Sequence, residues 1–232
     1  MRKKKLVLQC SCHFTQVGLE ALINESDLSA SLELVASARD ATQCGALLTD
    51  LPVVDIVILI LRNNDYNLAS LLELIGERLP HRHPSSQVVL MGNLGPMKVL
   101  RRCFGSLENV WPITTLSAPI AVLLKHMREI STADKRQAGE PRIGLSPHER
   151  LVLRKLLAGE SPNQIADSMA IHYKTVSYYK RSALAKLGMS SLSPLVVNRH
   201  NVAPTQKAIM VGLWKKLASA IKQPTPQKYE VG

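Results

Sequence analysis

One stretch of the chain, KTVSYYKRSALAKLG at residues 174–188, combines positive charge with helical periodicity. It holds four Lys or Arg side chains and no acidic one. Apolar side chains recur through it at helical spacing: Val176, Ala183, Leu184 and Leu187. A helix that buries this face exposes an unbalanced positive face, which suits a polyanion such as DNA.

A helical wheel at about 100° per residue separates the inner and outer faces of this stretch. The wheel places Lys180 with the inner residues. The outer face holds Lys174, Tyr178, Arg181 and Ala185, and Ser177 lies beside this group. Arginine can bond guanine in a bidentate manner in the major groove, so Arg181 is the predicted base reader. Thr175 lies at the helix start, where backbone N–H groups attract phosphate, and Lys180 and Lys186 are predicted phosphate neighbours. The predicted DNA-binding residues are therefore Lys174, Thr175, Ser177, Tyr178, Lys180, Arg181 and Lys186. The alternative is a solvated amphipathic helix with no partner.

The positive charge of the chain is concentrated near its C-terminus. Between residues 168 and 229 there are ten Lys or Arg and no Asp or Glu, which leaves 19 of the 29 basic residues against all 18 acidic ones elsewhere. Nucleic acid and an anionic membrane surface both suit such a field. No apolar run approaches the roughly 18 residues of a membrane span, and the start of the chain has no signal-peptide pattern. Four scattered cysteines fit a reducing compartment, so we expect a cytoplasmic protein.

Three helical segments are predicted around the basic stretch, at residues 147–158, 162–169 and 173–187. Ser146 can cap the first, with Glu149 completing a capping box, and Gly159 ends it. Ser161 and Gln164 repeat the capping arrangement for the second. A capped helix joined to a basic one by a tight connection near residue 170 describes a helix-turn-helix.

The first 130 residues follow a different pattern. Five short apolar runs predict buried strands at residues 6–8, 32–36, 53–61, 88–91 and 110–113. Helix-length amphipathic segments separate them, and the last ends near residue 130. Parallel strands need crossovers of helix length, so this alternation predicts a five-stranded parallel sheet with helices on both faces.

The predicted fold class is thus an α/β, doubly wound domain followed by an all-α helix-turn-helix domain. We expect four segments: a receiver-like domain at 1–130, a polar linker at 131–143, a helix-turn-helix domain at 144–202, and a C-terminal helix and tail at 203–232. Within them, a fourth helix is predicted near 192–198 and a fifth at 204–222.

Residues 144–189, GLSPHERLVLRKLLAGESPNQIADSMAIHYKTVSYYKRSALAKLGM, resemble the LuxR-type (NarL/FixJ-like) DNA-binding domain. The shared features are the Leu-Ser-Pro-x-Glu start, the Ala-Gly turn, Ile-Ala on the scaffold helix, and Lys-Thr-Val followed by Lys-Leu-Gly on the recognition helix. The sequence departs from the family at His172, where a Ser cap is usual, which predicts a less firm helix start. The resemblance implies a transcription regulator.

A five-fold βα domain ahead of such a domain looks like a response-regulator receiver. Receivers carry a phosphoacceptor Asp, Mg²⁺-binding acids and a Lys at the C-terminal ends of their strands. The corresponding positions here hold Cys10, Ser11, Arg62 and Thr115, and Mg²⁺ without carboxylates has no cage. Asp65 is a fallback acceptor. This degeneracy is similar to that of the auxiliary regulators of the Rcs phosphorelay, the RcsA-like and BglJ-like proteins. It implies phosphorylation-independent action and a receiver used as a homodimer face or to pair with an RcsB-type regulator.

Other functions are less well supported by the residues. Cys10, Cys12 and His13 would give at most half a metal site, and no nucleophile with its base, Walker loop or dinucleotide turn is present, so we expect no enzyme, no metal and no cofactor. The basic amphipathic segment 204–222 could lie on a membrane, but packing within the protein explains it better and we expect no membrane partner. A regulator that acts only through a protein partner, without contacting DNA, remains the alternative function.

Overall fold

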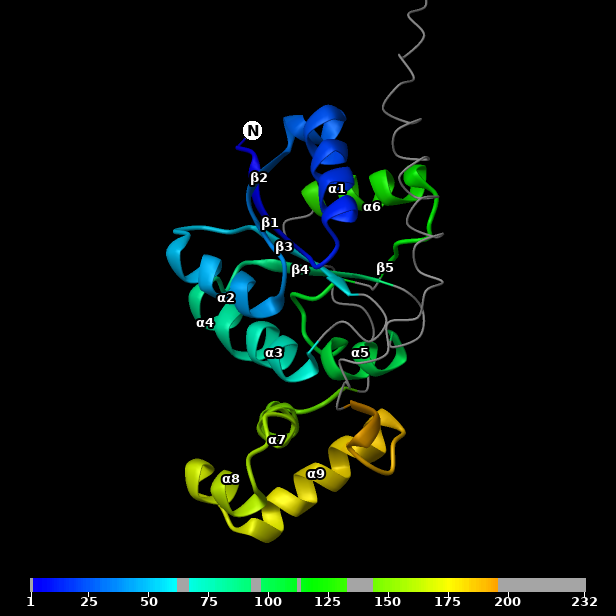
Figure 1. Ribbon diagram of the computed structural model, residues 1–232. Coiled ribbons are helices and arrows are strands. Elements are labelled where there is room, and N and C mark those ends of the chain that lie inside the picture. The colour runs from blue at the N-terminus through cyan, green and yellow to red at the C-terminus, as the bar shows by residue number, and fades with distance from the viewer. Residues whose placement is uncertain (1, 62–66, 93–96, 112–113, 133–143, 196–232) are drawn as a thin grey trace, which may run out of the picture.

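The computed structural model describes residues 2–61, 67–92, 97–111, 114–132 and 144–195. It contains an α/β body, followed along the chain by an all-helical body that lies below it in Figure 1. We call residues 2–132 the receiver-like body and residues 144–195 the helical body.

The receiver-like body is built on one parallel sheet with strand order β2-β1-β3-β4-β5. Its strands are β1 (Lys4–Cys10), β2 (Leu32–Ala38), β3 (Ile56–Leu61), β4 (Gln87–Gly92) and β5 (Thr114–Thr115). Four of the five predicted strands form, although β3 begins at Ile56, three residues after the predicted start at 53. The fifth strand is predicted over 110–113, of which residues 112 and 113 lie outside the described part. Val110 makes only an isolated bridge to Val88, and the two-residue β5 comes later and pairs with the end of β4. Residue 112 is a proline, which has no N–H to give to a ladder.

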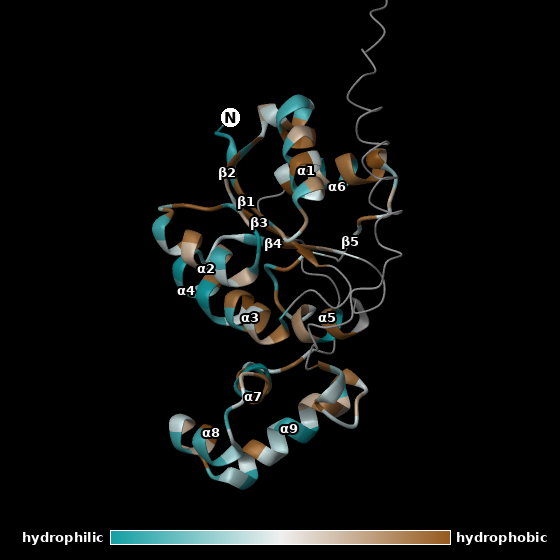
Figure 2. Ribbon diagram, in the orientation of Figure 1, coloured by the Kyte–Doolittle hydropathy of each residue, from teal (hydrophilic) through white to brown (hydrophobic). Residues whose placement is uncertain are grey.

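Helices cover both faces of the sheet, as the pattern predicts for a doubly wound domain (Figure 1). On one face lie α1 (His13–Glu25) and α6 (Ile120–Thr132), and on the other α2 (Ala41–Asp50), α3 (Leu68–Glu73), α4 (Leu79–Arg82) and α5 (Met97–Phe104). Successive residues of β3 alternate between the two cores, with Ile58 on the α1 side and Leu59 on the α3 side. Strands buried on both faces are continuous apolar runs, and they form the brown centre of Figure 2.

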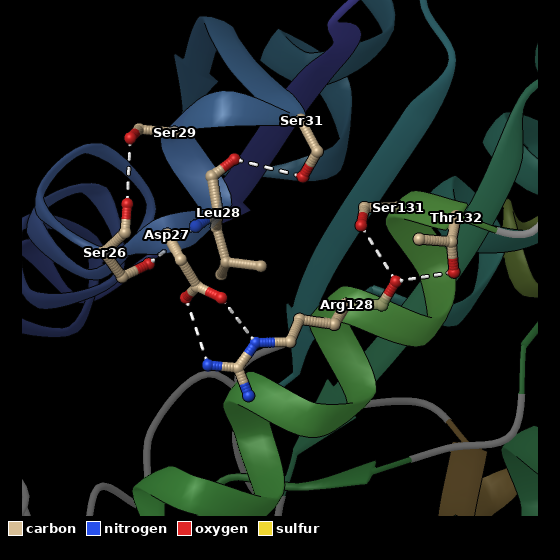
Figure 3. Close-up of polar contacts among 8 residues, drawn as sticks. All are labelled: Ser26, Asp27, Leu28, Ser29, Ser31, Arg128, Ser131 and Thr132. Atoms are coloured by element: carbon tan, nitrogen blue, oxygen red, sulfur yellow. Dashed lines mark hydrogen bonds and ion pairs between the residues drawn. The ribbon is translucent and has the colours of Figure 1, made fainter. Parts of the chain in front are cut away.

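Two local features shape the helices of this body. A short 3₁₀ turn, η1 (Asp27–Ala30), is held to α6 by an ion pair in which Arg128 Nε lies 2.7 Å from Asp27 Oδ2 (Figure 3). On the opposite face, α3 continues through a π-helical turn, η2 (Leu74–Arg78), into α4.

The helical body contains α7 (Pro147–Leu157), α8 (Pro162–Met169), α9 (Tyr173–Leu187) and a short 3₁₀ turn, η3 (Ser193–Leu195). Both predicted capping boxes are confirmed, because the hydroxyls of Ser146 and Ser161 accept from the backbone N–H groups of Glu149 and Gln164, whose side chains reciprocate. Gly159, with φ +93°, follows the first of these helices as predicted.

Several predictions concern residues outside the described part of the chain. They include most of the linker, the end of the fourth predicted helix, the whole segment 203–232, and the positions of Arg62 and Asp65. Of the predicted fourth helix, the described residues form only the 3₁₀ turn η3. Within the described residues, no helix has both the length and the apolar character needed to cross a membrane.

Candidate DNA-binding surface

Helix α9 is closed at both ends by local hydrogen bonds. At its start, Nδ1 of His172 accepts from the backbone N–H of Lys174 at 3.2 Å. An imidazole thus takes the place of the usual Ser cap, and the less firm helix start stays a prediction. At the other end Gly188 adopts φ +70°, and its N–H donates to the carbonyls of Leu184 and Ala185.

The two faces of α9 differ as the wheel predicts. The buried residues are Val176, Ala183, Leu184 and Leu187. The exposed residues of the opposite face include Lys174, Tyr178, Arg181 and Ala185. Tyr178 is 61% exposed, and Ala185, about two turns further along the helix, adds only a methyl group to this face. The structure thus places the predicted base reader Arg181 on one exposed surface with Lys174 and Tyr178.

The remaining predicted DNA-binding residues lie at the edges of this surface. Thr175, Ser177 and Lys180 are partly buried. The carbonyl of Ser177 accepts a long hydrogen bond, 3.4 Å, from Nε of Arg181, which orients that guanidinium along the helix. Lys186 is also partly buried, and its ammonium is paired with the carboxylate of Glu149.

A sharp turn sets α9 against the preceding helix. Ala170 ends α8 in the left-handed conformation at φ +53°, and the N–H of Ile171 donates to the carbonyl of Ala166 at 3.0 Å. Behind the turn, side chains from the three helices form a small core: Val152, Ile165, Ala166 and Val176. This arrangement is a helix-turn-helix with α9 in the position of the recognition helix.

Glu149 ties α7 to the recognition helix. Its carboxylate accepts from the backbone N–H of Ser146 at 2.6 Å, from the hydroxyl of Ser182 at 2.6 Å and from Nζ of Lys186 at 2.8 Å. Burial alone would raise the pKa of this carboxyl. The hydrogen bonds from Lys186, Ser182 and Ser146, with the positive charge of Lys186, outweigh burial and lower its pKa below the usual value.

Sequence reasoning assigned Glu149 to the capping box alone and missed this second task. The available signal was the spacing of Ser182 and Lys186, which lie four residues apart and so share one side of α9. A second contact missed at that stage joins the same helices, where the rings of His148 and Tyr179 stack with centroids 5.5 Å apart.

The predicted degenerate phosphoacceptor region lies at the C-terminal edge of the sheet. Cys10, at the end of β1, is buried and donates its thiol to the carbonyl of Cys12. Ser11 is exposed, and the hydroxyl of Thr115 lies 2.7 Å from that of Ser117. Asp55 lies at the opposite edge, where it accepts from the N–H of Lys5 at 2.7 Å. Among the described residues, no group of three or more His, Cys, Asp or Glu side chains could hold a metal ion.

Comparison with known proteins bears on both bodies. Residues 144–198 match the luxR family of bacterial regulatory proteins, GerE. This segment is similar to the domain that defines that family. No curated protein sequence matches the chain.

Solved structures also resemble most of the chain. A complex of the two-component response regulator RcsB with DNA aligns at 18% identity and a TM-score of 0.51, covering 84% of this chain and 97% of RcsB. RcsB from Salmonella enterica serovar Typhimurium bound to promoter rprA aligns at 18% identity and a TM-score of 0.49, with the same coverage. The response regulator ChrA of a heme-sensing two-component system aligns at 16% identity and a TM-score of 0.38, covering 90% of this chain and all of ChrA. The first similarity shows that the chain shares the receiver plus helix-turn-helix fold.

Proposed function

We propose that this chain is a sequence-specific DNA-binding transcription regulator that reads DNA with α9. The observation that carries the proposal is the exposure of Lys174, Tyr178 and Arg181 on a helix whose opposite face is buried. An α-helix fits the major groove, and a guanidinium held along its outer face can pair with O6 and N7 of guanine. The LuxR-family domain and the shared fold with RcsB, which has been solved with DNA, support the same use.

The other side chains on this surface have distinct roles in the proposal. Lys174 and Thr175 lie in the first turn of α9, where N–H groups favour a phosphate, and Lys180 flanks the surface as a phosphate neighbour. Tyr178 contacts a thymine methyl group or a phosphate. Lys186 positions the helix through Glu149 rather than contacting DNA, since its charge is already paired.

The receiver-like body acts without phosphorylation in this proposal. The strand ends at which receivers carry acids hold Cys10, with a thiol bonded locally, and Ser11. Neither side chain can coordinate Mg²⁺ as a carboxylate does. The body instead serves pairing, with a second copy of the chain or with an RcsB-type regulator.

Selection of bound duplexes from a random DNA pool by the full chain tests the proposed function. A single enriched motif, bound more tightly than a shuffled duplex across a salt series, is the expected result. If the chain enriched no motif and retained no duplex at moderate salt, the alternative of a regulator acting only through a protein partner would be favoured.

A further inference from the structure

The receiver-like and helical bodies share one apolar core. Leu145, Leu153 and Leu187 of the helical body are each at most 3% exposed. They belong to the same buried cluster as Leu71 of α3 and Phe104 of α5. The separate core of the helical body is small, and it consists of Val152, Ile165, Ala166 and Val176 with partly buried neighbours. The receiver-like body therefore covers part of the inner side of the recognition helix. The two meet where α9 passes below α5 in Figure 1.

Helix α3 forms most of the docking site for α7, and the π-helical turn η2 follows directly after α3. Pro80 lies just beyond the turn, and its ring would clash with the carbonyl of Gly76 in a regular helix. The wider turn avoids this clash, as the N–H of Leu79 reaches back five residues to the carbonyl of Leu74. Arg150 of α7 lies close to Gly76, with its Nε 4.0 Å from the position that a Cβ on Gly76 would take, which is an ordinary van der Waals distance.

Polar contacts join the bodies on both sides of this apolar seam. Nε of Arg154 on α7 lies 2.7 Å from Oε1 of Glu77 in η2, and the Arg154 side chain is only 19% exposed. At the start of the helical body, the N–H of Leu145 donates to the carbonyl of Arg102 at 3.2 Å. The hydroxyl of Ser106 donates to the carbonyl of Leu145 at 3.4 Å.

We propose that the receiver-like body is a scaffold that holds the recognition helix in its DNA-binding orientation, so that the docked chain, not a separated one, is the form that binds DNA. This inference rests on the proposed function. Its geometric basis is that docking buries Leu187 on the inner side of α9 while Lys174 and Arg181 on the outer side stay exposed. Glu77 and Arg154 are positioning residues, and neither touches the DNA-reading surface.

Charge reversal in the full chain tests the proposal, because docking and simple electrostatics predict different results. Glu77→Arg adds positive charge, so electrostatics alone predicts tighter DNA binding, whereas lost docking predicts binding weaker by about tenfold. Arg154→Glu also weakens binding, and the double variant Glu77→Arg/Arg154→Glu, which keeps the wild-type net charge, recovers most of the affinity. The motif preferred by each variant stays the same, since the reading side chains are untouched. Wild-type or tighter binding by Glu77→Arg would overturn the proposal.

A matched control uses the ion pair of Lys155 and Glu160, 3.0 Å apart within the helical body. Lys155→Glu/Glu160→Lys makes the same kind of exchange without crossing between the bodies, and it should leave affinity within about twofold. Circular dichroism shows which variants fold. If a single reversal fails to fold, the milder Glu77→Gln and Arg154→Gln replace it, with a smaller loss in the same direction.

A covalent lock gives an independent readout. A Cβ on residue 144 would lie 2.6 Å from Cβ of Ser106, so Gly144→Cys with Ser106→Cys can form a disulfide after a shift of about 1 Å. The proposal expects the oxidised, locked chain to bind the selected motif at least as tightly as the reduced chain. Loss of binding on oxidation, restored by reductant, would show that DNA binding needs separation. If the wild-type chain selected no motif at all, the proposed function would fail, whereas docking could still be tested by thermal unfolding. Docked bodies should unfold in a single transition, which Glu77→Arg should split into two.

Discussion

The ammonium of Lys186 lies 2.8 Å from Oε2 of Glu149, and this ion pair joins the last turn of α9 to the first turn of α7. Glu149 is 4% exposed and also holds Ser146 and Ser182. A buried carboxylate with three donors fixes the rotation of the recognition helix about its axis, and that rotation decides which side chains face DNA.

Glu149→Gln should lower the free energy of unfolding by roughly 1–3 kcal/mol, because the amide cannot satisfy all three donors and leaves Lys186 without its counter-charge. Denaturant unfolding of the full chain measures the change. Glu160→Gln is the matched control; its carboxylate pairs with Lys155 nearer the surface, and its loss should cost less than about 1 kcal/mol. Equal losses in the two variants would contradict the assigned role.

The same carboxylate predicts a pH dependence. The folded-state pKa of Glu149 is lowered, so the unfolded chain takes up this proton first as the pH falls. Its contribution is complete above the ordinary glutamate pKa of about 4.3 and is lost progressively below it. The stability difference between the wild type and Glu149→Gln should therefore shrink as the pH is lowered from 6 to 3. A constant difference across that range would show that the carboxylate charge is unimportant.

The sequence predicted those parts of the fold and of the surface that depend on short-range periodicity. The apolar spacing from Val176 to Leu187 defines the inner face of α9, and Ser161 with Gln164 marks the start of α8, because both patterns act within one or two helical turns. The contacts of Glu77 with Arg154 and of Arg102 with Leu145 could not be predicted. They join segments more than 40 residues apart, and nothing local in either segment indicates the partner. The π-helical turn was missed for a related reason, since Pro80 signals a disturbed helix but not its form.

Arg181→Ala should weaken the binding free energy for the selected motif by about 1–3 kcal/mol and leave binding to a shuffled duplex nearly unchanged, so that sequence preference falls. Lys174→Ala should instead weaken binding to both duplexes. It should also reduce the slope of log K against log salt by about 1, which is the signature of a phosphate contact. Arg82→Ala, an exposed arginine of the receiver-like body, is the control and should change neither quantity. Titrations by fluorescence anisotropy distinguish these outcomes. An unchanged preference in Arg181→Ala would remove that residue from the reading surface.

The close approach of Arg102 to Gly188 at the end of α9 can be tested separately from backbone strain, because a second glycine with positive φ, Gly159, has no such neighbour. Alanine is strained at Gly188 (φ +70°) and at Gly159 (φ +93°), which costs roughly 1 kcal/mol at each. A Cβ at position 188 would also lie 2.6 Å from Nη1 of Arg102, whereas one at position 159 meets no atom within 4 Å. Nη1 is the far end of a flexible side chain that can move aside, so Gly188→Ala should destabilise the chain only slightly more than Gly159→Ala does, and Arg102→Ala should remove the difference. Equal melting temperatures for the two glycine variants would show that Arg102 yields at no cost.

The receiver acid positions are occupied in the sequence by Cys10, Ser11, Arg62 and Thr115, which predicts that the chain does not take up phosphate. Incubation with a small phosphodonor and Mg²⁺, followed by intact-mass measurement, should show no phosphate adduct. A canonical receiver treated in parallel provides the positive control for the donor. An adduct on Asp65, identified by peptide mapping, would overturn the phosphorylation-independent mechanism.

Pairing through the receiver-like body has a specific surface to test. Phe14 on α1 is 66% exposed and Val122 on α6 is 40% exposed, and these helices cover the same face of the sheet. Large exposed apolar side chains favour a protein contact, since burying them removes apolar surface from water. Phe14→Asp and Val122→Asp should each shift the chain toward monomer in light scattering, or reduce its co-purification with an RcsB-type regulator. Val53→Asp is the control, because Val53 is 41% exposed but precedes β3 at the opposite edge of the sheet. If all three variants kept the wild-type assembly and the wild-type partner, pairing would have to use another surface.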